Sequence, residues 1–457
     1  MKEYTTRLGD APLGRLLIKL SLPGLASTIS TSLYNIVNTI WVSRIGFEAI
    51  AALTVIFPYQ ILCYAIGGGT GIGVAALVSR RFGEKNPEAT NHVAGQIFFL
   101  SAIWGLLFIL ASVSFPDQIV RILGARPDII EYSKQYLVIT SFGAPLVIFE
   151  VVVASLLRGS GDVVKPMIIM ISSTLINIVM DPLLIFGIGP FPEMGVSGAA
   201  LGTVIAQAFG ALLGLYYLLA GKTAYHIKLA HLRPDMSILK DIYRVGLPSV
   251  VTQVMESFVF VLFNNVVSSF SSIAIATFGI VIRISDFAFM PIMGISNGLL
   301  PIVGYNYGAR NYKRLWRAVK LASVGIMVLL AVITIFMVIF APQIVDVFSN
   351  DTALTAEAIP ALRIMLSTML FVGPTIMFVT AFQGLSQGTK ALILSLLRQF
   401  IFFIPLLFLF RHLFGLVGVW WSMPASDILS FALVYVFIYR EYKKHHDGDD
   451  DKPEKAW

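Results

Sequence analysis

The sequence contains a single cysteine, Cys63, and few charged residues. One cysteine excludes an internal disulfide framework and a thiolate metal cluster. Charged residues make up 13% of the 457 residues, about half of the ~25% found in soluble domains, whereas hydrophobic residues make up 57%. Polar groups could not cover so much apolar surface in water. The composition therefore excludes a soluble globular protein and favours a membrane protein.

Motifs of enzymes and nucleotide-binding proteins are incomplete. Residues 71–76 fit a GxGxxA dinucleotide pattern, but they lie inside an apolar run with no strand before them. Residues 221–223 end like a phosphate-binding loop, but Tyr216 stands where its first glycine is required. No HExxH motif occurs, and we expect most of the histidines to be solvated in loops or tails: His92, His226, His231, His412, His445 and His446. The sequence predicts neither an enzyme nor a bound cofactor.

Twelve apolar runs are long enough to cross a bilayer as helices, which takes about 20 residues. They lie at 16–44, 49–79, 92–115, 129–157, 163–188, 194–220, 241–270, 274–304, 317–341, 354–383, 389–411 and 415–440. The fold class predicted from this pattern is an all-α integral membrane protein with twelve transmembrane helices.

Basic residues indicate the orientation of the spans, because they are retained in cytoplasmic loops. The N-terminal stretch and most alternate loops after it contain Lys or Arg, whereas loops 186–194 and 268–274 contain neither. The net charge of +7 lies in these short clusters, which fits membrane orientation better than nucleic-acid binding. We expect a multi-pass protein of the cell (inner or plasma) membrane with both termini cytoplasmic and no cleaved signal peptide.

The two halves of the chain match at a constant offset of 225 residues. Pro23 aligns with Pro248, and GEKN at 83–86 aligns with GARN at 308–311. Each half holds six spans, so both enter the membrane in the same direction, as in a parallel repeat. The expected parts are an N-terminal lobe at 1–220, a cytoplasmic linker at 221–240, a C-terminal lobe at 241–440 and a charged tail at 441–457.

Two six-helix lobes can provide alternating access, in which one lobe rocks against the other around a central site. A repeat retained only for packing is the alternative. The polar residues favour transport, because they do not follow the repeat: Asp181 aligns with Leu406, and Glu256 aligns with Thr31.

Asp181 is the strongest candidate for an ion site, because a charge at mid-membrane costs roughly 2.5–3.5 kcal/mol on insertion scales. Asn177 precedes it by one helical turn, and Pro182 after it frees a backbone carbonyl. These oxygens could hold Na⁺, or Asp181 could bind a proton. Thr203 and Ala199 on the next span could add a hydroxyl and a carbonyl. The alternative is a polar contact that ties helices together.

Glu256 is a candidate for substrate binding, with Gln253 one turn before it and Met255 beside it. A carboxylate next to an adaptable Met suits a cavity for lipophilic cations. Glu256 could instead carry the coupling proton or form an interhelical hydrogen bond. Glu150 has no basic residue nearby in sequence, and substrate contact, proton carriage and a packing hydrogen bond are all open for it.

Four further charges are expected to pair with each other. Arg283 and Asp286 are spaced i,i+3 on one span, so they can neutralise each other. Arg398 and Asp427 lie in the last two spans, where an interhelical ion pair is favoured over a role of Arg398 in coupling.

Five stretches of the sequence carry a family likeness. They are LYNIVNTIWV at 33–42, AALVSRRFG at 75–83, LRGSGD at 157–162, NIVMDPLLIFG at 177–187 and GYNYGA at 304–309. Together they resemble the multidrug and toxic compound extrusion (MATE) family over essentially the whole chain, and the Asn-x-x-x-Asp-Pro run with Arg398 looks most like its DinF-type branch. The resemblance implies a V-shaped protein that exports amphiphilic, often cationic compounds in exchange for Na⁺ or H⁺.

The resemblance also implies positions for the sites. The first-lobe residues that match its cation or proton site are Asn177, Asp181, Thr203 and Ala199, with Tyr34 lining the same cavity. The family usually has an acidic residue in the first span, where this chain has Asn38 on the same face as Tyr34. Asn38 cannot bind a proton, so one formal charge is left at the site. Glu256 resembles an acidic residue of NorM-like members, so the second lobe could contribute.

Two other functions are possible for such a chain. A flippase for lipid-linked or polysaccharide precursors, as in related members of the same superfamily, would favour a strongly cationic cleft. A scaffold or receptor would show no gradient-dependent flux. For the transporter we expect amphiphilic small molecules and the bilayer as partners, a monomeric state and no nucleic acid.

Overall fold

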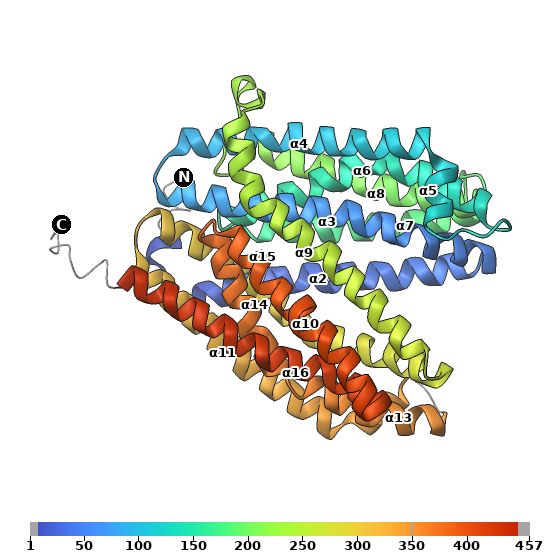
Figure 1. Cartoon of the computed structure of the whole chain (residues 1–457). Helices are drawn as coiled ribbons and strands as arrows, with labels where there is room; N and C mark the ends of the chain where they lie inside the picture. The colour runs from blue at the N-terminus through green and yellow to red at the C-terminus, as the bar shows by residue number, and fades with distance from the viewer. Residues whose placement is uncertain (1–7, 349–350, 447–457) are drawn as a thin grey trace.

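The computed structural model describes residues 8–348 and 351–446, and all regular elements within these ranges are helices (Figure 1). The first lobe contains α2 (Leu13–Ser43), α3 (Phe47–Gly83), α4 (Pro87–Ser114), α5 (Pro116–Ile122), α6 (Ile130–Gly159), α7 (Val164–Phe186) and α8 (Gly195–Leu219). A short 3₁₀ helix, η1 (Leu229–Leu232), follows. The second lobe contains α9 (Met236–Ser268), α10 (Ser272–Gly308), α11 (Tyr312–Ile339), α12 (Ala341–Asp346), α13 (Thr352–Leu366), α14 (Met369–Gly384), α15 (Gly388–Leu396), the π-helix η2 (Leu397–Phe403) and α16 (Ile404–His446).

The helix boundaries confirm the internal repeat. Shifting α3 and α4 by 225 residues reproduces the bounds of α10 and α11, and the short helices α5 and α12 begin at positions related by the same shift. The two lobes therefore have the same element order through α5 and α12, after which the single helix α6 corresponds to the pair α13 and α14.

The repeated GEKN and GARN motifs form the same turn between long helices. Gly83 and Gly308 end α3 and α10, and Lys85 and Arg310 then adopt left-handed backbone with φ of 55° and 56°. The Asn that closes each motif caps the following helix, accepting a hydrogen bond from the backbone N–H three residues later at 3.0 Å in one lobe and 3.1 Å in the other. The four residues of the motif thus end one helix, reverse the chain and start the next helix.

The prediction of twelve spans is confirmed once two irregular segments are taken into account. Ten helices are long and apolar enough to cross a membrane, and α13 with α14 forms one more span that is bent by 43°. The helical segment Gly388–His445 is long enough for two spans, and its backbone is non-helical at Gly415, with φ 59° and ψ −138°. A Cβ on Gly418 would lie 2.1 Å from the Phe410 carbonyl, so the chain folds back there and crosses twice.

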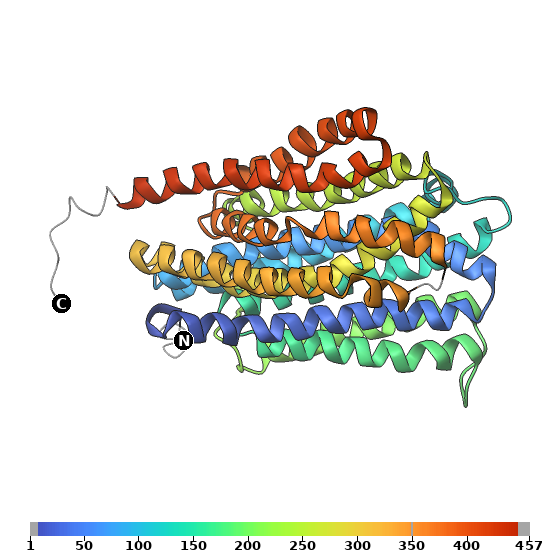
Figure 2. The same ribbon diagram turned by 90° about the horizontal axis from the view of Figure 1, so that it is seen from below.

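The lobes converge at the end of the molecule where α2 begins and α16 ends, and they diverge toward the other end (Figure 1). Figure 2 shows from below that the start of α2 and the end of α16 lie at the same end. We call the converged end the base. There α3 packs on α9 and α10, and α2 packs on α10. Gly83 lies against the Tyr305 carbonyl of α10, and Gly308 lies against the Arg80 carbonyl of α3; a Cβ would approach these oxygens to 2.0 and 2.1 Å. Glycine is required at both positions by this close approach.

The segment between the lobes is bound to α4 rather than loosely connected. The Gln96 amide donates to the carbonyls of His231 and Arg233 at 3.1 and 2.9 Å and accepts from the Asp235 N–H at 3.0 Å. His231 is 1% exposed, so the expectation of a solvated side chain is wrong for this residue. Its ring is buried because the segment packs on the backbone of Gly95, where a Cβ would lie 2.1 Å from the His231 carbonyl.

We predict that Gln96→Ala destabilises the protein by roughly 1–3 kcal/mol, because it leaves backbone groups of the linker without their partners. Gln135→Ala is the matched control, since Gln135 is exposed and accepts only a surface hydrogen bond from Ser197; its effect should stay within about 0.5 kcal/mol. The thermal midpoints of the two purified variants measure the difference. Equal midpoints would show that the linker contact contributes nothing.

Candidate functional site

The first candidate site lies near the end of α7, around Asp181. Asn177 and Asp181 face the same side, and the Asn177 amide donates to Asp181 Oδ1 at 2.9 Å. Asp181 is 0% exposed and Asn177 is 2% exposed. Asp181 Oδ2 and Asn177 Oδ1 have no hydrogen-bond partner within the described residues. Two unsatisfied oxygens therefore meet in a fully buried place.

Helix α8 closes the site on one side. A Cβ on Gly202 would lie 2.4 Å from Asp181 Oδ1, so the glycine lets the carboxylate approach the α8 backbone. Thr203, which follows Gly202, donates its hydroxyl to the Ala199 carbonyl at 3.1 Å. The Thr203 oxygen keeps its lone pairs, and both residues are buried.

Helix α2 packs beside α7 and contributes Asn38. The rings of Trp41 and Phe186 meet edge to face with centroids 6.2 Å apart, which aligns the outer parts of the two helices. Asn38 lies one turn before Trp41; it is 9% exposed, and its Oδ1 has no partner among the described residues. The Tyr34 side chain lies outside the described residues.

The chemistry of this site is that of hard oxygen ligands. It offers the free oxygens of Asp181 and Asn177, and Pro182 removes the N–H that would otherwise bind the Ile178 carbonyl. Carboxylate, amide and carbonyl oxygens suit hard cations. No basic side chain of the described chain acts on Asp181. A buried carboxylate without a basic partner is costly unless it binds a cation or a proton.

Glu150 is a second buried acid of the first lobe, at a junction of three helices. It projects from α6, is 7% exposed and packs on Gly210 of α8, where a Cβ would lie 2.5 Å from its carboxyl carbon. Ser173 of α7 forms a hydrogen bond with it. Gly210 lies about two turns beyond Gly202 on α8, so Glu150 is positioned apart from Asp181.

The second lobe contains a separate polar network around Glu256, which is exposed on α9. Gln399 donates to Glu256 Oε1 at 3.2 Å, and the neighbouring Arg398 approaches Asp427 of α16 to 3.4 Å. The predicted Arg398–Asp427 ion pair is therefore confirmed. Thr368, at the break between α13 and α14, donates to Asp427 at 3.4 Å.

This network depends on a local change of helix type that the sequence pattern did not reveal. Arg398 and Gln399 belong to η2, whose wider turns alter the direction of the side chains they carry. Sequence reasoning missed Gln399 and Thr368, because neither is charged and no periodic signal marks a π-helix. The Ser426 hydroxyl stabilises η2 by donating to the Arg398 carbonyl at 2.7 Å.

Gln253, proposed beside Glu256, faces another part of the protein. The Gln253 amide donates to the Ser249 carbonyl of its own helix at 3.2 Å, and its Oε1 lies 3.1 Å from where a Cβ on Gly68 of α3 would be. Gln253 thus faces the first lobe. Met255 is half-buried.

The predicted pair of Arg283 and Asp286 is wrong. Both side chains are exposed on α10, and no ion pair joins them within the part of the chain that the structure describes. An i,i+3 spacing permits such a pair but stabilises an exposed one only weakly.

A cluster of Glu88, His92 and His231 has the composition of a metal site, with ligand atoms within 4.8 Å of one another. Its hydrogen bonds do not fit one. The Lys228 N–H donates to His231 Nδ1 at 3.1 Å, so the proton of the neutral ring is on Nε2, which faces Glu88 at 2.9 Å. A nitrogen that donates to Glu88 cannot bind a metal, so the cluster ties the linker to α4.

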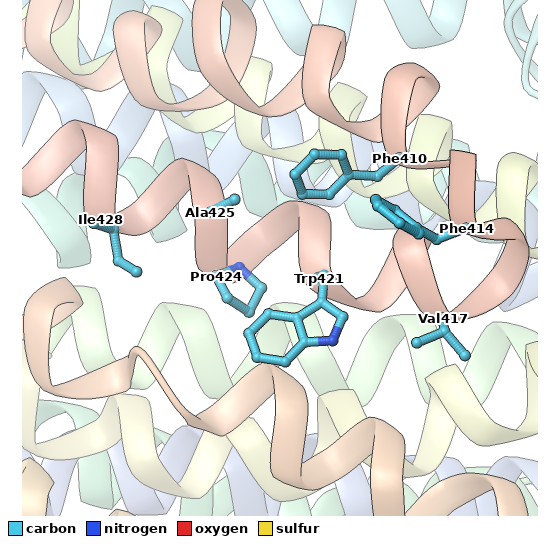
Figure 3. Close-up of a pocket in the computed structure, with 7 residues that line it drawn as sticks. All are labelled: Phe410, Phe414, Val417, Trp421, Pro424, Ala425 and Ile428. Atoms are coloured by element: carbon cyan, nitrogen blue, oxygen red, sulfur yellow. The ribbon is translucent and has the colours of Figure 1, made fainter. Parts of the chain in front are cut away.

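An apolar pocket of about 450 Å³ lies at the chain reversal in α16 (Figure 3). Phe410 and Phe414 line it before Gly415, and Trp421 and Pro424 line it after. Its lining residues carry no charged side chain, so it lacks the oxygen ligands found around Asp181.

Known proteins match this chain in both lobes and over nearly its whole length. The MatE family model matches residues 23–183 and 248–409, once in each lobe. The multidrug export protein MepA of Staphylococcus aureus (strain N315) is 29% identical over 435 residues, covering 94% of each chain, and MepA of Staphylococcus saprophyticus is 28% identical over 420 residues, covering 92% of each. A crystal structure of MATE in the straight conformation superposes with a TM-score of 0.91 at 28% identity, covering 97% of this chain and 99% of that one.

Proposed function

Because the chain belongs to the MATE family of membrane transporters, we propose that it is a secondary antiporter that exports amphiphilic, cationic compounds in exchange for Na⁺ or H⁺. The observation that carries this proposal is Asp181, a fully buried carboxylate with one oxygen unsatisfied and no basic partner in the described chain. Binding a coupling ion would neutralise it. The two Staphylococcus relatives are named multidrug export proteins, which supports the same function.

Asp181 would bind the ion together with Asn177. Further oxygens would come from Thr203 and Ala199 on α8, which contacts Asp181 through Gly202, and from Asn38 on α2, which packs on α7. With one formal charge, the site matches one Na⁺ or one H⁺. An ion bound there would hold α2, α7 and α8 together, so its release would let these helices move and change the shape of the first lobe.

The arrangement of the lobes supports alternating access. They meet at the base and diverge at the opposite end (Figure 1). Basic loops predict that the base is cytoplasmic, so the structure would represent a state open to the outside of a cell membrane. Opening at the base would require the α3–α9 and α3–α10 contacts to separate.

Cationic cargo is favoured over lipid-linked anionic precursors by the charge of Glu256. This carboxylate is exposed and receives a hydrogen bond from a neutral amide, while the nearby Arg398 is engaged by Asp427. Arg398 also acts on Glu256, but its ion pair is with Asp427, so two acids share one base. The excess negative charge attracts cations and repels phosphates.

The test measures uptake of a fluorescent lipophilic cation into proteoliposomes under a Na⁺ gradient alone and under a pH gradient alone. We predict that one of the two gradients drives accumulation of the cation up to about tenfold, since a gradient of one decade contributes about 1.4 kcal/mol per ion. Empty liposomes and an uncoupler provide the controls. Equal flux with and without either gradient would contradict antiport.

A further inference from the structure

A groove of about 780 Å³ runs along the second lobe between α11, α14 and α16. It is separate from both polar sites, and α11 and α16 lie on the side of the second lobe that faces away from the first (Figure 1). The lining changes along α11 from basic residues near the base to apolar residues deeper in the span.

The basic end consists of Lys313, Arg317 and Lys320 on the first turns of α11. Their spacing places them on one helix face, and all three are exposed. None of them forms an ion pair within the described residues. Glu441 on α16 does not neutralise them, because it is bonded to Gln387 and Lys390, both at 2.8 Å. The groove therefore has an uncompensated positive end.

Two buried polar groups line the groove next to these charges. Trp316 is 8% exposed and Ser323 is 6% exposed, and neither the Trp316 Nε1–H nor the Ser323 hydroxyl has a hydrogen-bond partner in the described part of the chain. Both atoms are covered by the surrounding side chains, so recognition of a ligand at this end depends on the three exposed charges.

The rest of the groove is apolar and aromatic. Val324 and Met327 continue the face of α11, and Phe378 and Tyr435 form the opposite wall. Residues 313 to 327 span about 21 Å of helix. A ligand that fills the groove must therefore have an anionic head and a long apolar part.

We propose that this groove is a binding site for an anionic phospholipid of the bilayer leaflet at the base. The phosphate would lie at Lys313, Arg317 and Lys320, and an acyl chain would lie against Met327 and Phe378. Basic pockets between membrane helices at the interface are suited to such headgroups. A lipophilic cation would be repelled by the same three charges, so the site does not belong to the proposed transport pathway.

The test is native mass spectrometry of the full-length protein in detergent, with phosphatidylglycerol or phosphatidylcholine of the same acyl chains. We expect preferential retention of phosphatidylglycerol, reduced about one hundredfold in the triple variant Lys313→Gln, Arg317→Gln, Lys320→Gln. The matched control removes three exposed basic residues near the base outside the groove, Lys228→Gln, Lys240→Gln and Arg244→Gln, and should retain the preference.

Two further arms keep the proposal falsifiable if the triple variant misfolds. The single variant Arg317→Gln removes one charge from the middle of the basic end and should weaken retention by about fivefold. Glycerol 3-phosphate has the charge without acyl chains and should not displace the lipid at equal concentration. Equal retention of the two lipids, equal loss in the control variant, or displacement by glycerol 3-phosphate would each overturn the lipid site.

Discussion

Asp181→Asn is expected to reduce gradient-driven export by between about tenfold and about one hundredfold while leaving the protein folded. The substitution keeps the size of the side chain and an oxygen that can accept from Asn177. It removes the negative charge, and a hydrogen bond or ion contact to a charged group is worth roughly 1.5–3 kcal/mol. Losing that amount weakens ion binding by one to two decades. Efflux of a fluorescent cation from proteoliposomes measures the rate.

The control for this variant is Asp286→Asn. Asp286 is also an acidic residue within a predicted span, but it is exposed and forms no ion pair in the described chain. Its export rate should remain within about twofold of the wild type. If Asp181→Asn exported at the same rate as Asp286→Asn under the same gradient, the first-lobe site would be assigned to the wrong residue.

The second large effect is expected at the base, for Gly83→Ala. The new Cβ would lie 2.0 Å from the Tyr305 carbonyl of α10, and backbone cannot move aside as a flexible side chain can. Overpacking of this kind costs typically about 1–3 kcal/mol. Because the strain falls on the contact that joins the lobes, the variant should both unfold at a lower temperature and favour conformations with the base separated. Gly308→Ala should behave in the same way, since its Cβ would lie 2.1 Å from the Arg80 carbonyl.

Gly325→Ala separates this effect from the helix propensity of alanine. Gly325 lies in α11, and a Cβ there would meet nothing within 4 Å. Alanine is favoured over glycine in a helix by about 0.8–1.0 kcal/mol, so this variant should be unchanged or more stable. The thermal midpoints and transport rates of Gly83→Ala, Gly308→Ala and Gly325→Ala measure the effect of the contact. If Gly83→Ala were as stable and active as Gly325→Ala, the close contact at Gly83 would not be required for stability or transport.

Much of the architecture is predictable from the sequence because it depends on local patterns. Long apolar runs specify the membrane helices, and the 225-residue repeat specifies that the lobes are duplicates. The turn motifs at 83–86 and 308–311 contain their own helix cap, so the positions of α4 and α11 follow from a few residues. The spacing of Asn177 and Asp181 also places them together, since both lie on one regular helix.

The features that escaped prediction are those that depend on contacts between distant segments. The burial of His231 results from packing of the linker on α4, which no local pattern indicates. The bend between α13 and α14 and the π-helix at Leu397–Phe403 have no dedicated sequence signal. Glu256 therefore receives its hydrogen bond from Gln399. The sequence had drawn attention only to the neighbouring Arg398, because of its charge.

The contact between α3 and α10 has a consequence for the origin of the chain. Gly83 touches the segment that contains Gly308, and Gly308 touches the segment that contains Gly83. Such reciprocity is the signature of an isologous interface between two identical subunits. The halves thus meet as the protomers of a homodimer would, whereas Asp181 and Glu256 each occur in only one of them. Joining two such copies in one polypeptide would let each copy change independently, which a symmetric homodimer does not permit.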